Sequence, residues 1–397
     1  MNAMMPAALA GRLPPDAALL GRAPGRANLM GEHTDYNDGF VLPAALGLTV
    51  VVGGRPTRGE IRLRSIGSRE AVVVDPSDGS GPTTGWGRYV TAVVRALLDD
   101  GLRIRGVEGV IASDLPSGTG LSSSAALEVA VALAILDEPI DPVRLAVLCQ
   151  RAENVHVGVR CGIMDQMASV AAHAGSALLL DSRSVAIEHV PIPTGLELLI
   201  VDSGQRHSLA DGDYNRRRAE CEEAARLLGV TSLRHVERLD DLEALPPPLD
   251  ARARHVVSEN IRTLATADAL HRDDRAALRL LFAQSHASLA DDFAVSTPAL
   301  DALVELVGAT DGVVGARMTG GGFGGCTVSL VEAGLPDGEV ARLVARYEQR
   351  TGLRARYWRS PASSGALELR TTSRSARPRR VEARRAGPAA DRRRSHR

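Results

Sequence analysis

Apolar positions along the chain follow two kinds of spacing, and each kind predicts a different element. Runs rich in valine, leucine and isoleucine predict three strands in the first half: 39–53, 61–65 and 71–74. Apolar positions at helical spacing predict helices at 88–99 and 125–136. A third helix is expected to start with Asp141 as N-cap and Pro142 at its first position, and to run toward His156. Residues 1–20 are rich in alanine and proline and predict a flexible lead-in.

A second half begins near Leu196, where the string LELLIVDSG predicts a buried strand followed by a polar, arginine-rich loop. Helical spacing then predicts helices at 216–228, along much of 251–307 and at 338–349, with a loop at 246–250. Three further runs predict strands: 312–317, 326–331 and 355–358. No repeat at solenoid spacing is present in the sequence.

The length of 397 residues suits two lobes with a ligand cleft between them. Charge is unevenly distributed, because the net charge is −1 while residues 370–397 contain eleven arginines against two carboxylates. Residues 1–369 therefore carry a net charge of about −10, which makes them a poor binder of nucleic acid. The arginine-rich tail predicts a disordered extension, with contact to an anionic surface as the alternative.

All 47 basic residues are arginine, and the absence of lysine excludes several reaction classes. P-loop nucleotidases, protein kinases and Schiff-base enzymes each need an amine that this chain lacks. Any nucleotide phosphates must therefore be held by backbone amides and a metal ion.

The cysteines are widely spaced and form no CxxC pair, which argues against a zinc cluster or a disulfide framework: Cys149, Cys161, Cys221 and Cys326. No apolar run reaches the roughly 20 residues that a bilayer requires, and the N-terminus lacks an export signal. We therefore expect a cytoplasmic protein without membrane contact.

Three strings carry candidate chemistry. The first, LPSGTGLSSSAAL at 115–127, precedes an apolar helical stretch, so its glycines and the helix start can present amides to an anion. The second, GRANLMGEHTDYNDGFVLP at 25–43, is dense in short polar side chains and suits a ligand with several hydroxyls, unless it is a solvated acidic turn. The third, CGIMDQ at 161–166, places Asp165 twelve positions after Glu153; this carboxylate could be a buried N-cap, a magnesium ligand or a proton acceptor.

Two further strings, at 214–221 and 318–327 (MTGGGFGGCT), add a possible sugar contact and a second backbone-rich phosphate wall. Taken together, these strings resemble the GHMP kinase superfamily and, within it, the galactokinase family, from about residue 24 to 365. The arginine-rich tail and the lack of lysine are not family features, and neither touches a motif.

The resemblance implies an α+β protein with two lobes, of which the N-terminal one resembles domain 2 of ribosomal protein S5. The implied ranges are 21–190 and 191–369, with the active site in the cleft between them. It also implies ATP-dependent phosphorylation of the anomeric hydroxyl of D-galactose in galactose catabolism, with Mg²⁺ as cofactor and a monomeric enzyme. The alternatives are a kinase for N-acetylgalactosamine or arabinose, or a non-catalytic galactose sensor. Such sensors lack a Ser-Ala pair that is present here as Ser124 and Ala125.

The resemblance assigns a role to each matching position. Asp165 matches the catalytic aspartate and Arg26 the arginine that steadies charge during transfer, while Ser124 and Glu153 match the residues associated with magnesium. The implied sugar contacts are Glu32, His33, Asp35, Gly162 and Tyr214. The implied nucleotide contacts are Trp86, Pro116, Ser117, Gly118, Thr119, Gly120, Leu121, Ser122, Ser123, Ser124 and Ala125.

Overall fold

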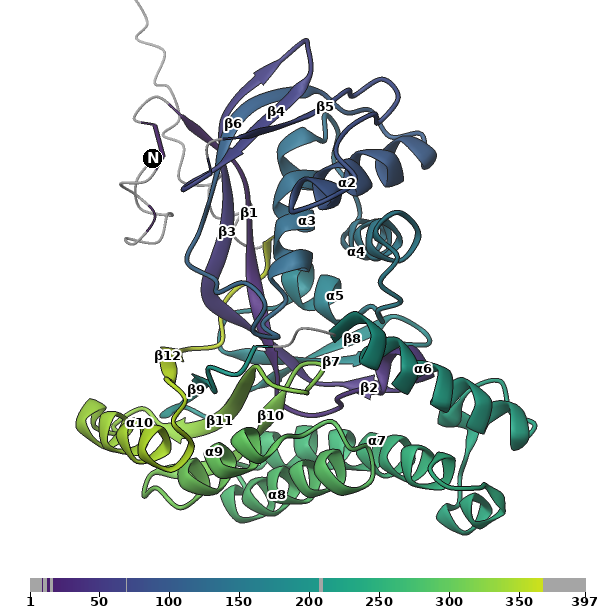
Figure 1. The fold of residues 1–397 in the computed structure, drawn as a ribbon, viewed down its shortest axis with the longest axis vertical. Coiled ribbons are helices and arrows are strands. Elements are labelled where there is room, and N and C mark those ends of the chain that lie inside the picture. The colour runs from purple at the N-terminus through teal and green to yellow at the C-terminus, as the bar shows by residue number, and fades with distance from the viewer. Residues whose placement is uncertain (1–8, 10–12, 15–16, 69, 207–209, 367–397) are drawn as a thin grey trace, which may run out of the picture.

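The computed structural model describes residues 9, 13–14, 17–68, 70–206 and 210–366. A five-stranded sheet in the order β1-β3-β6-β4-β5 forms the upper lobe in Figure 1. Its strands are β1 (Ala18–Asn28), β3 (Pro43–Thr57), β4 (Ile61–Ser65), β5 (Ala71–Val74) and β6 (Gly106–Ser113). Neighbouring strands are antiparallel except for β4 and β6, which run parallel.

Helices cover one face of this sheet (Figure 1). They are α2 (Gly87–Asp99), α3 (Ser123–Ile135), α4 (Pro142–Arg151) and α5 (Met164–Ala171). Helix α3 is apolar on nearly all sides because it lies between the sheet and the other three helices. It can approach the sheet closely because β1 carries Gly21, where an added Cβ would lie 2.0 Å from the carbonyl oxygen of Ala130. A π-helix, Ala152–Val157, continues α4 and carries Glu153.

The lower lobe contains a four-stranded sheet in the order β10-β11-β9-β12. Its strands are β9 (Leu196–Asp202), β10 (Val313–Thr319), β11 (Cys326–Glu332) and β12 (Arg356–Ser360). Alternate residues of β9 face opposite sides, so Leu199 and Val201 join one apolar cluster with α9 (Pro298–Gly308) and α10 (Asp337–Thr351). Leu198 and Ile200 join the large cluster that continues into the upper lobe, so one core spans both lobes.

The remaining elements connect the lobes or extend the lower one. A three-stranded sheet joins β2 (Phe40–Val41), β7 (Ser176–Asp181) and β8 (Ala186–Pro191). Helices α6 (Ala210–Leu227), α7 (Leu249–His271) and α8 (Arg275–Asp291) follow, with short 3₁₀ turns at Asp35–Asn37, Leu233–His235 and Leu239–Ala244. None of the described helices is long and apolar enough to cross a membrane.

The α+β, two-lobed prediction is confirmed, whereas several local predictions need correction. The string at 25–43 is not a solvated acidic turn, because it begins on β1, which carries Arg26, and because Arg26, Glu32 and His33 are buried. Strand β1 also begins inside the predicted lead-in, and Leu9 and Leu13 of that lead-in are buried. Helix α6 begins at Ala210 and not at 216. The arginine-rich tail lies outside the described residues.

Candidate active site

A cavity of about 350 Å³ lies where the lobes meet. It collects residues from every string that the sequence singled out. The lining residues are Arg26, Glu32, His33, Asp35, Tyr89, Gly118, Gly120, Ser122, Ser123, Ser124, Glu153, Val159, Cys161, Gly162, Met164, Asp165, Tyr214, Gly320, Gly321, Gly322 and Phe323.

The serine-containing string forms a loop that ends in the first turn of α3. Gly118, Gly120 and Ser122 have φ values of 68°, 78° and 59°, a left-handed conformation that glycine adopts at little cost. Because α3 begins at Ser123, its unpaired amides and the positive end of its dipole lie at the cavity. This geometry can hold an anion without a lysine.

The glycine-rich string 318–327 packs its main chain directly against that loop. A Cβ added to Gly320 would lie 2.8 Å from the carbonyl oxygen of Gly120, and one added to Gly325 would lie 2.8 Å from that of Thr119. Both glycines have positive φ values. The string therefore needs glycine because two backbones meet without side chains between them.

Arg26 and Asp165 form an ion pair at the centre of the cavity. Nη2 of Arg26 is 2.6 Å from Oδ1 of Asp165, and Nη1 donates to the carbonyl oxygen of Gly120 over 2.7 Å. Ser122 donates its hydroxyl to Oδ2 of Asp165 over 2.6 Å. Burial acts to lower the pKa of Arg26, but Asp165 and Glu32 outweigh it and raise that pKa. The guanidinium is therefore charged, and it links the Asp165 carboxylate to the loop 115–127.

A group of buried carboxylates lies beside this pair. Burial and the Asp165 carboxylate raise the pKa of Glu153 to about 7, and Gln166 donates to Glu153 Oε2 over 3.0 Å. Burial and Glu153 raise the pKa of Glu128 well above its usual range. Such an excess of carboxylate oxygens, next to the Ser124 hydroxyl that bonds Glu153, fits a hard divalent cation. Among the described residues no three His, Cys, Asp or Glu side chains surround a common position, so phosphate oxygens would have to complete the coordination.

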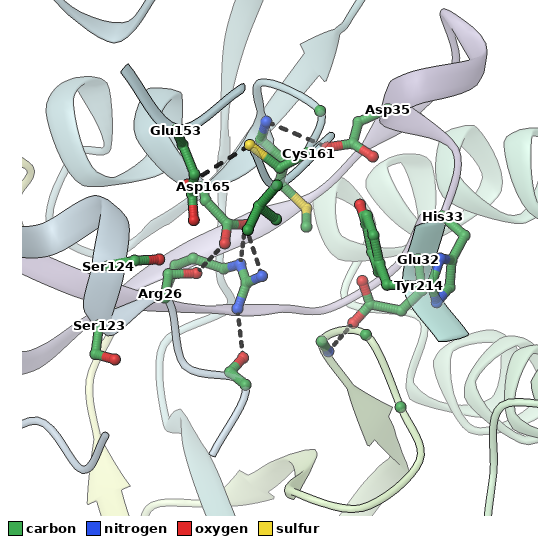
Figure 2. Close-up of a pocket in the computed structure, with 18 of the residues that line it drawn as sticks. Arg26, Glu32, His33, Asp35, Ser123, Ser124, Glu153, Cys161, Asp165 and Tyr214 are labelled. Atoms are coloured by element: carbon green, nitrogen blue, oxygen red, sulfur yellow. Dashed lines mark hydrogen bonds and ion pairs between the residues drawn. The ribbon is translucent and has the colours of Figure 1, made fainter. Parts of the chain in front are cut away.

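The side chains of Glu32, His33 and Tyr214 gather on the other side of the ion pair (Figure 2). Glu32 accepts from the amide of Gly320 over 2.6 Å and from Nδ2 of Asn28 over 2.7 Å. Nδ1 of His33 is 2.8 Å from the hydroxyl of Tyr36, and burial lowers the pKa of His33 to about 3, so its imidazole is neutral. Neutral imidazole and carboxylate offer both donor and acceptor sites to a polyol.

Asp35 and Gly162 line the same side of the cavity as Glu32 and His33. A Cβ on Gly162 would lie 1.9 Å from Oδ2 of Asp35, so this position requires glycine. Burial and the carboxylate of Asp165 raise the pKa of Asp35 to about 6. The ring of Tyr214 lies 5.4 Å from that of His33 and closes this part of the cavity.

The structure brings together the predicted catalytic, metal and sugar residues but only part of the predicted nucleotide set. Gly118, Gly120 and the three serines line the cavity. The other predicted nucleotide residues lie outside its described lining: Trp86, Pro116, Ser117, Thr119, Leu121 and Ala125. Leu121 and Ala125 are instead buried in the core.

Several lining residues were not assigned a role from the sequence. Tyr89 lies in the first turn of α2 and receives a hydrogen bond from Arg88 over 3.1 Å. Its position three residues after Trp86 was the available signal, because such residues share a helix face. The thiol of Cys161 donates to Asn154 Oδ1 over 3.2 Å, and nothing in the spacing of the cysteines indicated this.

Comparison with known families gives three matches. The galactokinase galactose-binding signature matches residues 11–56. The N-terminal domain of GHMP kinases matches residues 88–173, and the C-terminal region of GHMP kinases matches 266–349. The matches fall in the order expected from the sequence strings.

Similar proteins and structures agree with these matches. A galactokinase of Chloroflexus aggregans is 49% identical over 345 residues, which cover 82% of this chain and 87% of that protein. A galactokinase of Roseiflexus sp. is 44% identical over 360 residues, covering 86% and 90%. The crystal structure of Lactococcus lactis galactokinase complexed with galactose has a TM-score of 0.82 at 31% identity, covering 89% of this chain and 95% of that one. Mevalonate kinase of Methanococcus jannaschii, with a TM-score of 0.61 at 16% identity and coverage of 88% and 99%, shares the fold alone.

Proposed function

Because the chain belongs to the galactokinase family of the GHMP kinases, we propose that it transfers the γ-phosphoryl group of ATP to the anomeric hydroxyl of D-galactose. The products are galactose 1-phosphate and ADP. One observation carries the proposal: the Arg26–Asp165 ion pair lies between the serine side chains of the loop 115–127 and the cluster of Glu32, His33 and Tyr214 (Figure 2). A sugar on one side and a terminal phosphate on the other would meet at this pair.

The loop 115–127 is proposed to hold the triphosphate. Its backbone amides, which are accessible because the loop contains glycine, and the start of α3 supply partial positive charge. Arg26 supplies one full positive charge. Phosphoryl transfer depends more on positioning and charge neutralisation than on covalent help, so a chain without lysine can perform it.

Asp165 is proposed to orient the anomeric hydroxyl and to receive its proton as the bond from oxygen to phosphorus forms. A loose transition state delays the need for a base, so orientation comes first. The hydrogen bond from Ser122 and the ion pair with Arg26 fix both carboxylate oxygens of Asp165. Arg26 then balances the negative charge that passes to the leaving ADP.

Ser124 and Glu153 are proposed to hold Mg²⁺ together with the nucleotide phosphates. The ion, when bound, neutralises phosphate charge. The protein's part is to keep the Glu153 carboxylate in place, and Gln166 does so by donating to its Oε2 over 3.0 Å.

Glu32, His33, Asp35, Gly162 and Tyr214 are proposed to bind the sugar. A site built to hydrogen-bond hydroxyls rejects analogues that lack one, because its own buried groups are then left unpaired. Galactose recognition is therefore expected to depend strongly on individual hydroxyls.

The decisive experiment measures ADP release by the purified protein with ATP, Mg²⁺ and a panel of acceptors. The panel contains galactose, N-acetylgalactosamine, arabinose, glucose, mevalonate and homoserine, and phosphorus NMR identifies the product. The expected result is a 1-phosphate of galactose as the main product. Phosphorylation of mevalonate or homoserine but of no sugar would refute the proposal, and binding of galactose and ATP without turnover would identify a sensor.

A further inference from the structure

A charged cluster lies buried next to Glu32, outside the cavity lining. Arg317 on β10 and Glu259 on α7 are both 0% exposed. Nη2 of Arg317 lies 3.6 Å from Oε1 of Glu259 and 3.8 Å from Oε1 of Glu32. Burying such groups costs several kcal/mol per ion before pairing, and well-packed apolar side chains can often replace them. Stability alone therefore does not account for this pair.

Glu259 holds the main chain that leads into Glu32. Its Oε1 accepts from the amide of Gly31 over 3.0 Å and from the hydroxyl of Ser285 over 2.7 Å, and its Oε2 accepts from Nε of Arg262 over 2.7 Å. Burial acts to raise the pKa of Glu259, but Arg317 and Arg262 outweigh it and lower that pKa to about 2. The carboxylate is thus ionised and fully engaged.

Arg317 acts on Glu32 from the other direction. Its Nη1 donates to the carbonyl oxygen of Asn28 over 3.1 Å, and Nδ2 of Asn28 donates to Oε2 of Glu32 over 2.7 Å. Its Nη2 faces Oε1 of Glu32, which also accepts from the Gly320 amide. Both oxygens of Glu32 are therefore oriented by this network, which leaves their remaining lone pairs for a ligand.

We propose that Arg317 and Glu259 are positioning residues for sugar recognition, which hold the Glu32 carboxylate at the angle where it accepts a sugar hydroxyl. The inference rests on the proposed function, in which Glu32 contacts the sugar. Neither residue lines the cavity, so both act through Glu32 and its segment. A pure binding role predicts a higher KM for the sugar, with kcat and the KM for ATP nearly unchanged.

The test compares Arg317→Met with the double variant Glu259→Gln/Arg317→Met. Leaving one buried charge unpaired can prevent folding, so the double variant, which removes both charges of the pair, is measured beside the single one. In either variant the KM for galactose is expected to rise roughly tenfold or more, the loss typical of a charged hydrogen bond. The KM for ATP, measured at saturating galactose, is expected to rise by a much smaller factor than the KM for galactose.

Arg252→Met is the matched control. Like Glu259, Arg252 lies on α7 and is buried, and its hydrogen bonds within the described residues go to Glu220 and to the carbonyl oxygen of Asp292, away from the segment around Glu32. This variant is expected to lower the unfolding midpoint while leaving both KM values unchanged. The control thus distinguishes a general loss of protein stability from a displacement of the Glu32 carboxylate.

Monodeoxy galactoses provide the second readout. In the wild type, each monodeoxy galactose is expected to have a higher KM than galactose, and this rise in KM is the penalty for the missing hydroxyl. The variant Glu32→Gln first identifies the hydroxyl that donates a hydrogen bond to Glu32, because the penalty for removing that hydroxyl becomes smaller. The same hydroxyl, and no other, is expected to lose its penalty in Arg317→Met. If the penalties and the galactose KM stay at wild-type values, or if the KM values for sugar and ATP rise by the same factor, the positioning role is wrong. If the wild type fails to phosphorylate galactose, the proposed function fails instead.

Discussion

At the scale of single residues, Asp35 is a proposed sugar contact whose buried carboxylate lowers the stability of the folded protein when it is ionised. Its carboxylate lies against Gly162, where any larger residue would collide with it. It accepts from the amides of Tyr36 and Met164 over 3.0 and 3.4 Å, and yet burial and Asp165 raise its pKa to about 6. The folded protein therefore favours the protonated form of Asp35 more than the unfolded chain does.

Replacing Asp35 by asparagine is expected to stabilise the ligand-free protein at pH 8 but not near pH 3. Below the unfolded-state pKa the carboxyl is neutral in both states, and as pH rises past about 6 the folded state must carry the unfavourable charge. The gain at pH 8 is expected to be about 1 to 3 kcal/mol. Urea unfolding at both pH values measures it, and an equal gain at the two values would contradict this account.

Asp165→Asn is expected to lower kcat by at least about 10²-fold, because an amide can neither take the proton nor pair with Arg26 as a carboxylate does. ATP affinity is expected to stay within a few-fold, because Asp165 bonds the loop through Ser122 and pairs with Arg26, which itself stays bonded to the carbonyl oxygen of Gly120. Single-turnover kinetics and titration with a non-hydrolysable nucleotide measure the two quantities. A variant that keeps a tenth of the rate would exclude the catalytic role.

At the scale of elements, the contact between the loop 115–127 and the glycine-rich string 318–327 shapes the proposed nucleotide side of the cavity. Their main chains approach so closely that a single methyl group at Gly320 or Gly325 has no room. The amide of Gly325 donates to the carbonyl oxygen of Gln205 over 3.3 Å, and its own carbonyl oxygen accepts from Ser203 over 2.9 Å. The string is therefore fixed on both sides.

Gly325→Ala is expected to raise the KM for ATP about tenfold, because the methyl group must push back the carbonyl of Thr119 and alanine is disfavoured at the positive φ of this residue. Gly334→Ala is the control, since nothing lies within 4 Å of its added Cβ. Steady-state kinetics with varied ATP compares the two variants. Equal KM values in both would show that the close approach does not shape the nucleotide site.

The elements that could be predicted from the sequence are those with a clear local signal. Helix α4 starts as expected, because the side chain of Asp141 caps it by accepting from the amide of Arg144 over 3.0 Å. Strand β1 was missed, because its alternation is hidden by glycine, arginine and proline in ALLGRAPGRAN. The π-helix that carries Glu153 was also missed, because nothing in local spacing distinguishes it from a continued α-helix.

At the scale of the whole molecule, one hydrogen bond links the two proposed substrate sides of the cavity. Glu32, on the proposed sugar side, accepts from the amide of Gly320, whose Cα lies against Gly120 of the loop 115–127. The carbonyl of Gly120 in turn accepts from Arg26. A ligand that orders either end of this chain is expected to order the other.

Galactose and nucleotide are therefore expected to bind with positive coupling, each raising the affinity for the other by the same factor, roughly fivefold or more. Calorimetry with a non-hydrolysable ATP analogue, with and without saturating galactose, measures one direction, and the reverse titration measures the other. Sorbitol at equal concentration is the control for unspecific effects. Independent affinities in both titrations would show that the Glu32–Gly320 bond transmits nothing.

Sequence strings identified most of the residues that line the cavity but not the side chains that hold them. Glycine pairs, serines and clustered carboxylates carry their chemistry in local order, so the proposed catalytic and sugar-binding residues could be matched position by position. Arg317 and Glu259 could not be found this way, because their contacts with residues 28–32 join positions more than 200 apart in the chain. Trp86 was assigned by position in a family alone, and it lies outside the described cavity lining.

The anchoring of the segment around Glu32 has a consequence for engineering hybrids. Although the galactose-binding signature lies wholly in the first 56 residues, its main chain is held by Arg317, Glu259 and His255 of the other lobe. A chimera that exchanges the N-terminal lobe between two sugar kinases would thus transplant the signature without its supports. The chimera would acquire the sugar preference of the donor enzyme only if α7 and β10 of that enzyme were transferred together with its N-terminal lobe.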